Sequence, residues 1–333
     1  MKNTKSKKDL FSIILSAIDA GGWKALIVEK NHPFFLKAIK RQGSEQDNLN
    51  LRIYIWNCTH GGGAARSKDE YRVQLTGVVP KDKEGETTLL LGWHDGYQVF
   101  AGFDITRHAG QSSASPSIQV KEHTLINAHQ HSFSLYERSN GEIAVAFRPE
   151  YLIDYALNMA KFHGFKTGRP AEIELLNKVD DLKDDEIAAI KNKDRKEVIT
   201  NIKRKYREYD FRNRVLSAYS HKCAMCGIQL KLIEAAHILP VSCKGSTDDT
   251  FNGVALCALH HLAYDNNLVS FDKKYRIRLS ESRLQVLGKA NLTGGIDAFT
   301  NNLLSAIHLP ADRRDYPRPE IIEESNKLRA WEP

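Results

Sequence analysis

The chain has 333 residues, of which 48 are Lys or Arg and 41 are Asp or Glu, which gives a net charge of +7. With 41% hydrophobic and 27% charged residues, the composition excludes a wholly disordered or fibrous chain, and the length suggests about two domains. No apolar run approaches the roughly 20 residues that cross a bilayer, so we expect no membrane partner. Five cysteines, an odd number, do not make a disulfide scaffold and favour a reducing cytoplasm.

The first element is expected to be a helix. Basic residues 2–8 and the apolar stretch 10–18 resemble the opening of a signal peptide, but polar residues interrupt the apolar stretch. Its hydrophobic positions recur at helical spacing, so an amphipathic helix is the better interpretation.

Residues 1–165 predict a mixed α+β domain with an antiparallel sheet. Alternating or apolar runs bounded by turn residues give six candidate strands, and the turns Asp95-Gly96 and Asn140-Gly141 are typical of hairpins. A helix over 152–162 closes this domain. The candidate strands are 51–56, 71–78, 87–93, 97–103, 131–136 and 142–147.

A charged segment follows. Residues 166–208 are expected to form a helical connector, and a short helix over 211–219 begins a second domain at residues 209–333. Residues 191–214 contain ten Lys or Arg and four Asp or Glu, so this segment carries most of the chain's net positive charge.

The strongest chemical pattern joins two pairs of metal-binding residues. Cys223-x2-Cys226 is followed by Cys257-x2-His260, and each such pair can offer two ligands from one tight turn. This spacing predicts a structural Zn²⁺ site. The alternative is a set of buried, reduced cysteines with a helix histidine. Cys243 lies outside the spacing and is expected to be a loop residue.

Between these pairs the chain reads Glu-Ala-Ala-His-Ile-Leu-Pro over 234–240, which contains His237, and Asn252 follows. His261 comes directly after the second pair, so the order is His, Asn, His. This pattern resembles the HNH endonuclease family and its Ala-Ala-His-Ile-x-Pro subgroup. The resemblance covers about residues 209–333 and implies a zinc-framed ββα-metal fold with metal-dependent phosphodiester hydrolysis.

The resemblance also implies roles for individual residues. His237 would be the general base, because imidazole titrates near the working pH, and Asn252 would hold it through the following loop. His261 and Asp265, four residues apart on one helix face, would bind one catalytic Mg²⁺ or Mn²⁺ per site.

The sequence departs from the family before the base. Many members carry a metal-binding Asp or His at the position of Ala236, so the metal shell is short here. Glu234 is a candidate replacement, although strand alternation turns it away from His237. His260 and His261 are adjacent, and helix geometry points them about 100° apart, which suits two different metals.

Two regions are candidate DNA contacts. Basic residues near the start of the second domain would bind phosphates, although nearby acidic residues also fit a solvated helix. The Gly61-Gly62-Gly63 loop, which ends near Arg66, can approach phosphate closely. The basic candidates are Lys203, Arg204, Lys205, Arg207, Arg212 and Arg214.

Several strand aromatics could line a pocket for a flipped or modified base, although core packing is the more common role of such residues. They are Trp56, Trp93, Tyr97, Phe100 and Phe103.

A target-reading domain, a basic connector and a cleaving domain together predict a restriction-type defence endonuclease. Its partners would be double-stranded DNA, with or without base modification, and a second copy of the chain, because one active site per chain cuts one strand at a time. The alternatives are a non-catalytic zinc-stabilised DNA-binding protein and a nuclease triggered by a small signalling molecule.

Overall fold

The computed structural model describes residues 4–40, 48–61, 67–110, 116–164 and 177–331. The chain divides into two compact units, residues 1–203 and 204–333. Each unit has its own hydrophobic core and is described by itself. Among the described helices, none has the length and apolar content needed to cross a membrane.

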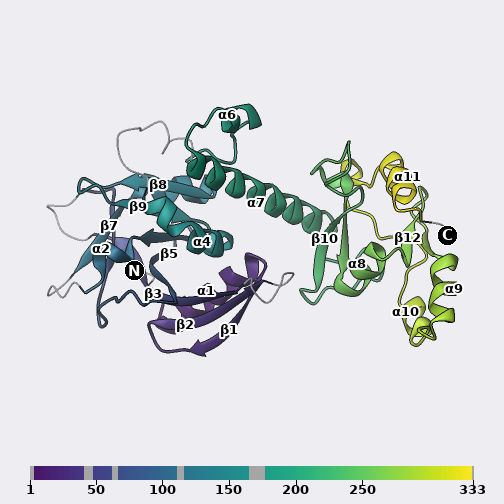
Figure 1. Ribbon diagram of the computed structural model, residues 1–333, viewed down its shortest axis with the longest axis horizontal. Coiled ribbons are helices and arrows are strands. Elements are labelled where there is room, and N and C mark those ends of the chain that lie inside the picture. Colours follow the sequence, from purple (N-terminus) through teal and green to yellow (C-terminus); the bar gives the residue numbers. More distant parts are fainter. Residues whose placement is uncertain (1–3, 41–47, 62–66, 111–115, 165–176, 332–333) are drawn as a thin grey trace. The chain divides into compact units, whose positions relative to one another are not determined.

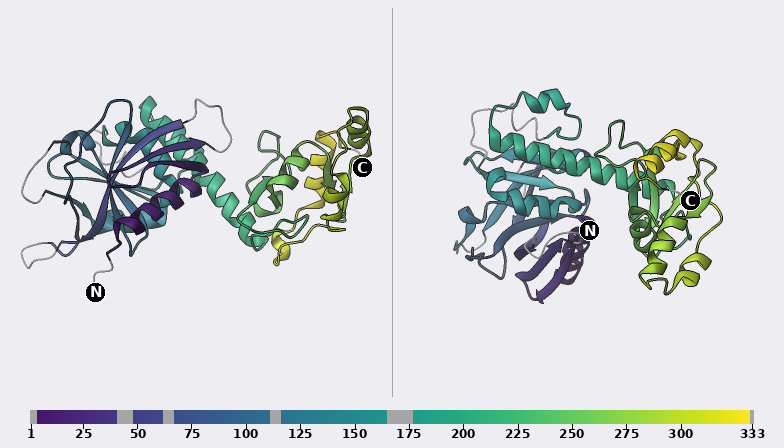
Figure 2. Two further views of the ribbon diagram at one scale, coloured as in Figure 1. Left: turned by 90° about the horizontal axis from the view of Figure 1, so that it is seen from below. Right: turned by 45° about the vertical axis from the view of Figure 1, so that its right-hand side comes forward.

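The N-terminal unit is built on a nine-stranded sheet, which twists strongly along its width (Figures 1 and 2). Seven strands follow in the order β1-β2-β3-β5-β6-β9-β8, and β4 links β3 to β7. The strands are β1 (Trp23–Glu29), β2 (Phe34–Lys40), β3 (Asn48–His60), β4 (Glu70–Gln74), β5 (Thr87–His94), β6 (Val99–Phe103), β7 (Ser117–Lys121), β8 (Phe133–Glu137) and β9 (Ile143–Phe147).

The predicted antiparallel sheet is confirmed with one exception. Strands β3 and β5 pair in parallel, whereas the other pairs are antiparallel. The parallel pair arises because the chain leaves β3, forms β4 beside it and returns to start β5 in the same direction. The predicted hairpin turns are confirmed: Asp95-Gly96 joins β5 to β6, and Asn140-Gly141 joins β8 to β9.

In the N-terminal unit, strands β1, β2 and β7 were not expected from the sequence, and neither were helices α2 (Ile105–His108) and α3 (Glu122–His131). Strand β1 has an exposed carboxyl-terminal half, so its apolar residues do not alternate with polar ones as they do in a half-buried strand. Strand β7 is only five residues long, and helix α3 (Glu122–His131) is rich in His and Asn. Weak periodicity of this kind predicts no element.

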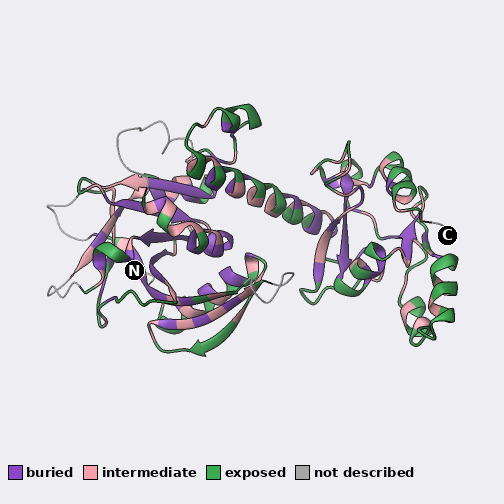
Figure 3. Ribbon diagram, viewed as in Figure 1, coloured by how far each residue is buried: buried purple, intermediate pink, exposed green. Residues whose placement is uncertain are grey.

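Helices cover the sheet. On one face, α1 (Lys7–Ala20) and α4 (Leu152–His163) share a core with the strands, and the turn η1 (Pro149–Tyr151) leads into α4. The other face packs against β4, β7 and α3. Figure 3 shows the central strands buried. The predicted opening and closing helices are therefore present.

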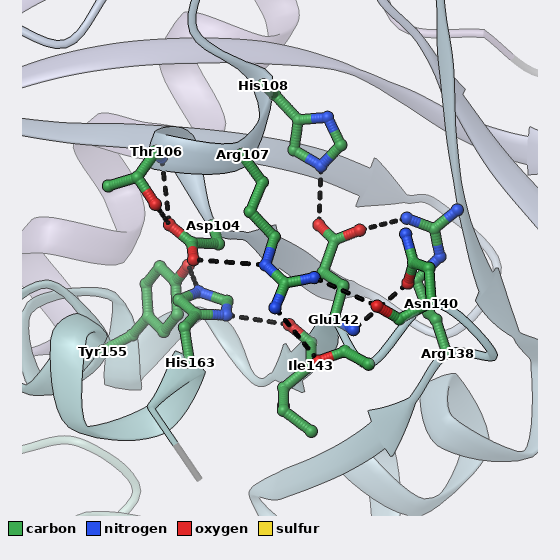
Figure 4. A network of polar contacts seen from close by, with 11 residues as sticks. Asp104, Thr106, Arg107, His108, Arg138, Asn140, Glu142, Ile143, Tyr155 and His163 are labelled. Carbon is green, nitrogen blue, oxygen red and sulfur yellow. Dashed lines mark hydrogen bonds and ion pairs between the residues drawn. The ribbon is translucent and has the colours of Figure 1, made fainter. Parts of the chain in front are cut away.

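A buried polar network ties the short helix α2 (Ile105–His108) to the β8–β9 hairpin (Figure 4). Glu142 is 1% exposed; one carboxylate oxygen lies 2.6 Å from Nε2 of His108, and the other pairs with Arg138. Arg107 donates hydrogen bonds of 3.3 Å to the carbonyl oxygens of residues 140–141. Burial raises the pKa of Glu142, but the hydrogen bond to His108 and the charges of His108 and Arg138 hold it below its ordinary value.

The predicted connector contains α6 (Asp184–Ala188) and the first part of α7 (Lys193–Ala218). The separate helix expected at 211–219 is wrong, because α7 continues through these residues without a break. The boundary between the units falls inside α7. Apolar side chains from the first part of the helix are buried in the core of the N-terminal unit, and those from its last part are buried in the core of the C-terminal unit. Apolar residues at both ends explain why the charged middle does not interrupt the helix.

The C-terminal unit contains small, separate elements. Two hairpins, β10–β11 and β12–β13, share a core with α7 and α11, whereas α9 and α10 have no buried residues. The elements are β10 (Ile233–His237), η2 (Thr250–Asn252), β11 (Gly253–Cys257), α8 (Ala258–Asp265), β12 (Val269–Phe271), β13 (Ile277–Leu279), α9 (Glu281–Lys289), α10 (Ile296–Asn301), η3 (Arg313–Asp315) and α11 (Pro319–Leu328).

Candidate active site

The candidate site is built on a ββα unit. Strands β10 and β11 pair antiparallel, with Ile233 opposite Cys257 and His237 opposite Gly253, and α8 follows β11 directly. His237 is the last residue of β10.

His237 lies between an aromatic ring and a carboxylate. Its imidazole stacks on Phe211 of α7, with ring centroids 3.7 Å apart and planes 7° from parallel. Nε2 lies 3.1 Å from Oδ1 of Asp248. Burial lowers the pKa of His237 below its ordinary value, and the hydrogen bond to Asp248 opposes that shift. The environment therefore favours a neutral imidazole whose orientation is fixed.

The close approach of α7 depends on a glycine. A Cβ atom at Gly253 would lie 2.2 Å from Cγ2 of Val215 and 3.0 Å from the ring of Phe211. Because Gly253 pairs with His237 across the hairpin, the missing side chain leaves room for the ring that stacks on the histidine.

Arg214 of α7 holds the loop that carries Asp248. Its guanidinium donates to the carbonyl oxygen of Asp248 at 2.6 Å and to Oγ1 of Thr250 at 3.0 Å. Its Nε pairs with Asp210 at 2.8 Å. Arg214 was predicted as a DNA contact; the structure places its charged group among these protein partners.

Asn252 is fully buried and positions the backbone after His237. Its Oδ1 accepts a hydrogen bond of 2.9 Å from the N–H of Leu239, and its Nδ2 donates to the carbonyl oxygen of Thr247 at 2.8 Å. These contacts agree with the expectation that Asn252 acts through the following loop. Asn252 makes no hydrogen bond with the His237 ring among the described contacts.

His261 has a carboxylate at each ring nitrogen. Nδ1 lies 2.7 Å from Oε2 of Glu234, and Nε2 lies 3.5 Å from Oδ2 of Asp265. The hydrogen bond to Glu234 raises the pKa of His261 above its ordinary value. The structure thus brings together three of the predicted metal-site residues, and Glu234 contacts the histidine from the strand face opposite to His237.

The two predicted cysteine and histidine pairs also meet. The ligand atoms of Cys223, Cys226, Cys257 and His260 all lie within 4.8 Å of one another. Nδ1 of His260 lies 3.2 Å from the sulfur of Cys257 and 3.5 Å from that of Cys223. Ligands about 2.3 Å from a tetrahedral Zn²⁺ have comparable separations, so this donor set is compatible with structural zinc.

The geometry and the family comparisons agree. Residues 223–272 match the HNH endonuclease family. The C-terminal unit thus carries an HNH domain, and this domain supports nuclease function and implies DNA as the substrate. HNH nucleases depend on a metal, and the described residues include one cluster, of three cysteines and a histidine, that could hold a metal ion.

Residues 49–156 match a second family, described as Methylase-associated X1. A comparison with curated proteins finds no match. One similar solved structure is a "Modification dependent TagI restriction endonuclease", with 10% identity, coverage of 83% of this chain and 80% of that chain, and a TM-score of 0.29.

The basic candidates on α7 differ in their surroundings. Arg204, Arg207 and Arg212 are exposed, and Lys205 is half-buried. Lys203 is only 8% exposed and pairs with Asp184 at 3.5 Å, so its charge is turned toward the protein. Arg66 and residues 62–65 of the glycine-rich loop lie outside the described residues.

Most of the aromatic residues considered for a base pocket lie in the core. Trp56, Trp93, Phe100 and Phe103 are at most 5% exposed, so the structure supports the core alternative for these four.

Tyr97 differs, because it is half-buried and belongs to a polar cluster. Its hydroxyl donates to Oε1 of Glu122 at 2.9 Å, and the hydroxyl of Tyr71 donates to the same oxygen at 3.2 Å. The Tyr97 ring stacks on His94, with centroids 4.7 Å apart.

Sequence reasoning missed Asp248, Phe211 and Arg214 as parts of the His237 environment. The loop that carries Asp248 is polar, and no spacing rule relates it to the histidine. Phe211 and Arg214 lie more than 20 residues before His237, and only the approach of α7 to the hairpin brings them together.

Proposed function

We propose that this protein is a metal-dependent DNA endonuclease of restriction or defence type, with His237 as the general base. One observation carries the proposal: the last residue of the first HNH strand is a histidine whose Nε2 contacts Asp248 at 3.1 Å and whose ring rests on Phe211. These two contacts would hold the ring in one orientation for a proton transfer.

The Asp248 contact assigns the protons of His237. An ionised carboxylate only accepts hydrogen bonds, so Nε2 carries the proton and Nδ1 keeps its lone pair. Nδ1 has no hydrogen-bond partner among the described residues. We propose that Nδ1 takes a proton from a water molecule, whose oxygen attacks phosphorus as the bond to the leaving deoxyribose oxygen breaks.

His261 and Asp265 would hold the catalytic Mg²⁺ or Mn²⁺. Their facing atoms are 3.5 Å apart, close to the roughly 3 Å between neighbouring ligands of an octahedral ion. A bound ion would balance the negative charge on the phosphate and on the leaving oxygen. Glu234, at 2.7 Å from Nδ1, would orient the imidazole in place of direct ligation. Ala236 supplies no metal ligand, and in this arrangement Glu234 would support the metal site by orienting His261.

The donor set of Cys223, Cys226, Cys257 and His260 would hold a structural Zn²⁺ beside the ββα unit. Three of the four residues are buried, which suits a closed structural site. Bound zinc would fix the start of α8, which carries His261.

DNA contact is proposed along α7 and in the N-terminal unit. The exposed Arg204, Arg207 and Arg212 would bind phosphates without reading sequence. In the N-terminal unit, the Tyr97 ring and the carboxylate of Glu122 offer a stacking surface beside a hydrogen-bond acceptor for a base amino group. The family that residues 49–156 match is described as methylase-associated, so we propose that the methylation state of the DNA determines whether it is cut.

The direct test uses the full chain with Mg²⁺ or Mn²⁺ and matched plasmid and phage DNA, modified and unmodified. We expect cleavage of at least one of these substrates, and sequencing of the ends would give the target. If every substrate stays intact while the protein still binds DNA, the alternative of a non-catalytic DNA-binding protein is favoured. If cleavage requires an added nucleotide, the alternative of a signal-activated nuclease is favoured.

A further inference from the structure

Strand β1 lies at the outer edge of the nine-stranded sheet and pairs only with β2 among the described strands (Figure 1). Three consecutive apolar residues on it are exposed: Leu26 by 52%, Ile27 by 42% and Val28 by 59%. Figure 3 colours most of this strand as exposed. An apolar edge strand with unpaired backbone groups is a ready template for another strand.

A bulge near the end of β1 decides which side chains share a face. Ile27 pairs with Leu36 of β2, and Glu29 pairs with the next residue along, Phe35, so Val28 is the extra residue. Direct cross-strand partners point to the same face. Lys24, Leu26 and Glu29 pair with Ile39, Lys37 and Phe35, which alternate along β2, so these three β1 residues lie on one face.

We propose that β1 pairs antiparallel with β1 of a second copy of this chain, which continues the sheet across a two-fold axis. An axis perpendicular to the sheet requires opposed residues to share a face. Centring the axis at Leu26 meets this requirement. Leu26 then lies opposite Leu26 of the partner subunit. Because Val28 is the extra residue of the bulge, Glu29 takes the second place after Leu26, and Lys24 lies opposite Glu29 of the partner subunit.

Charge complementarity supports this occupant. Lys24 and Glu29 are both exposed, and neither forms a hydrogen bond or ion pair with another residue in the part of the chain that the structure describes. The charge of Arg52, in the same cross-strand row as Glu29, also acts on this glutamate. In the proposed pairing each lysine meets a glutamate, twice across the axis, and exposed apolar side chains lie between the two pairs. A parallel pairing or a one-residue shift would lose these matches.

The dimer has a functional consequence, which rests on the proposed function. One HNH domain per chain cuts one strand at a time, whereas two copies bring two active sites to one DNA molecule. Loss of the dimer would then leave nicking intact and reduce double-strand cleavage. The pairing itself needs no metal, DNA or activity, so it can fail or hold independently of the nuclease.

The test is a charge-reversal series measured by light scattering on the full chain at several concentrations, without DNA. The wild type is expected at twice 37.7 kDa. Lys24→Glu and Glu29→Lys should each place like charges in opposition and shift the mass toward 37.7 kDa, whereas the double variant should restore the dimer. Lys8→Glu on α1, also exposed, is the matched control and should stay dimeric.

Circular dichroism confirms that each variant is folded. A wild type that stays at 37.7 kDa at every concentration would overturn the proposal. Single variants that keep the wild-type mass, or a double variant that stays monomeric, would overturn it equally. None of these outcomes depends on whether the protein cuts DNA.

Discussion

Oδ1 of Asp248 lies 3.1 Å from Nε2 of His237, and Arg214 holds the backbone of the same aspartate from α7. The carboxylate orients the imidazole, and the arginine fixes the loop that presents the carboxylate. The histidine therefore depends on a helix that begins outside the HNH-matched residues.

Replacing this carboxylate should alter both rate and pH dependence. We expect Asp248→Asn to lower kcat by about 100-fold or more, because a general base held in the wrong orientation or tautomer loses most of its contribution. The hydrogen bond to Asp248 raises the pKa of His237 against the effect of burial. Without it the pKa falls further, so the acid limb of the rate profile should move to lower pH.

The measurement is a pH–rate profile under single-turnover conditions with saturating DNA. Asp249→Asn, on the neighbouring exposed residue, is the matched control and should keep the wild-type profile. An Asp248→Asn variant with the same rate and the same acid limb as the wild type would contradict the positioning role.

Loss of one zinc ligand should unfold the C-terminal unit. Structural zinc contributes on the order of 10 kcal/mol to small domains, so Cys257→Ser should abolish the cooperative unfolding of this unit and remove the bound metal. Metal analysis and thermal unfolding measure both effects. Cys243→Ser, outside the cluster, should retain one zinc per chain. If Cys257→Ser keeps its zinc and its unfolding transition, the four-residue site is wrong.

Glu234 should act on metal binding through His261. Glu234→Gln removes the charged partner of Nδ1, and loss of such partners typically weakens metal affinity 10- to 100-fold. Calorimetric titration with Mn²⁺ measures the affinity, with Glu281→Gln on α9 as an exposed control. An affinity equal to that of the wild type would argue against the orienting role, and complete loss of binding would favour direct ligation by Glu234.

Glu142 should stabilise the N-terminal unit at neutral pH. Its folded-state pKa lies below the ordinary value of 4.5, so its stabilising effect is present above that pH and is lost as the pH falls through the folded-state pKa. Glu142→Gln removes the buried carboxylate that contacts His108 and pairs with Arg138, and should cost about 3–5 kcal/mol at pH 7.

Denaturant unfolding at pH 7 and at pH 3.5 tests this dependence. The difference between wild type and Glu142→Gln should shrink at the lower pH, whereas the exposed Glu84→Gln should match the wild type at both. A difference that is the same at both pH values would show that the carboxylate's charge is not responsible.

Local patterns in the sequence predicted most of the site. Two short spacings identified Cys223, Cys226, Cys257 and His260, and the helical interval of four placed His261 beside Asp265. Such intervals work because they lie within one turn or one helix, where the backbone alone sets the distance.

Contacts between distant segments could not be predicted in this way. The stacking of Phe211 on His237 depends on the approach of α7 over Gly253, which no local spacing encodes. Strand β1 was missed for a related reason: its exposed edge removes the alternation by which a half-buried strand is recognised. The parallel pairing of β3 and β5 likewise depends on the path of the chain between them.

The central claim is tested most directly by His237→Ala, compared with the wild type on the same cleavable DNA. We expect the variant to bind this DNA with unchanged affinity in a gel-shift assay, while its single-turnover cleavage rate falls by at least 100-fold. Cleavage by His237→Ala at the wild-type rate, with binding also unchanged, would contradict the assignment of His237 as the base.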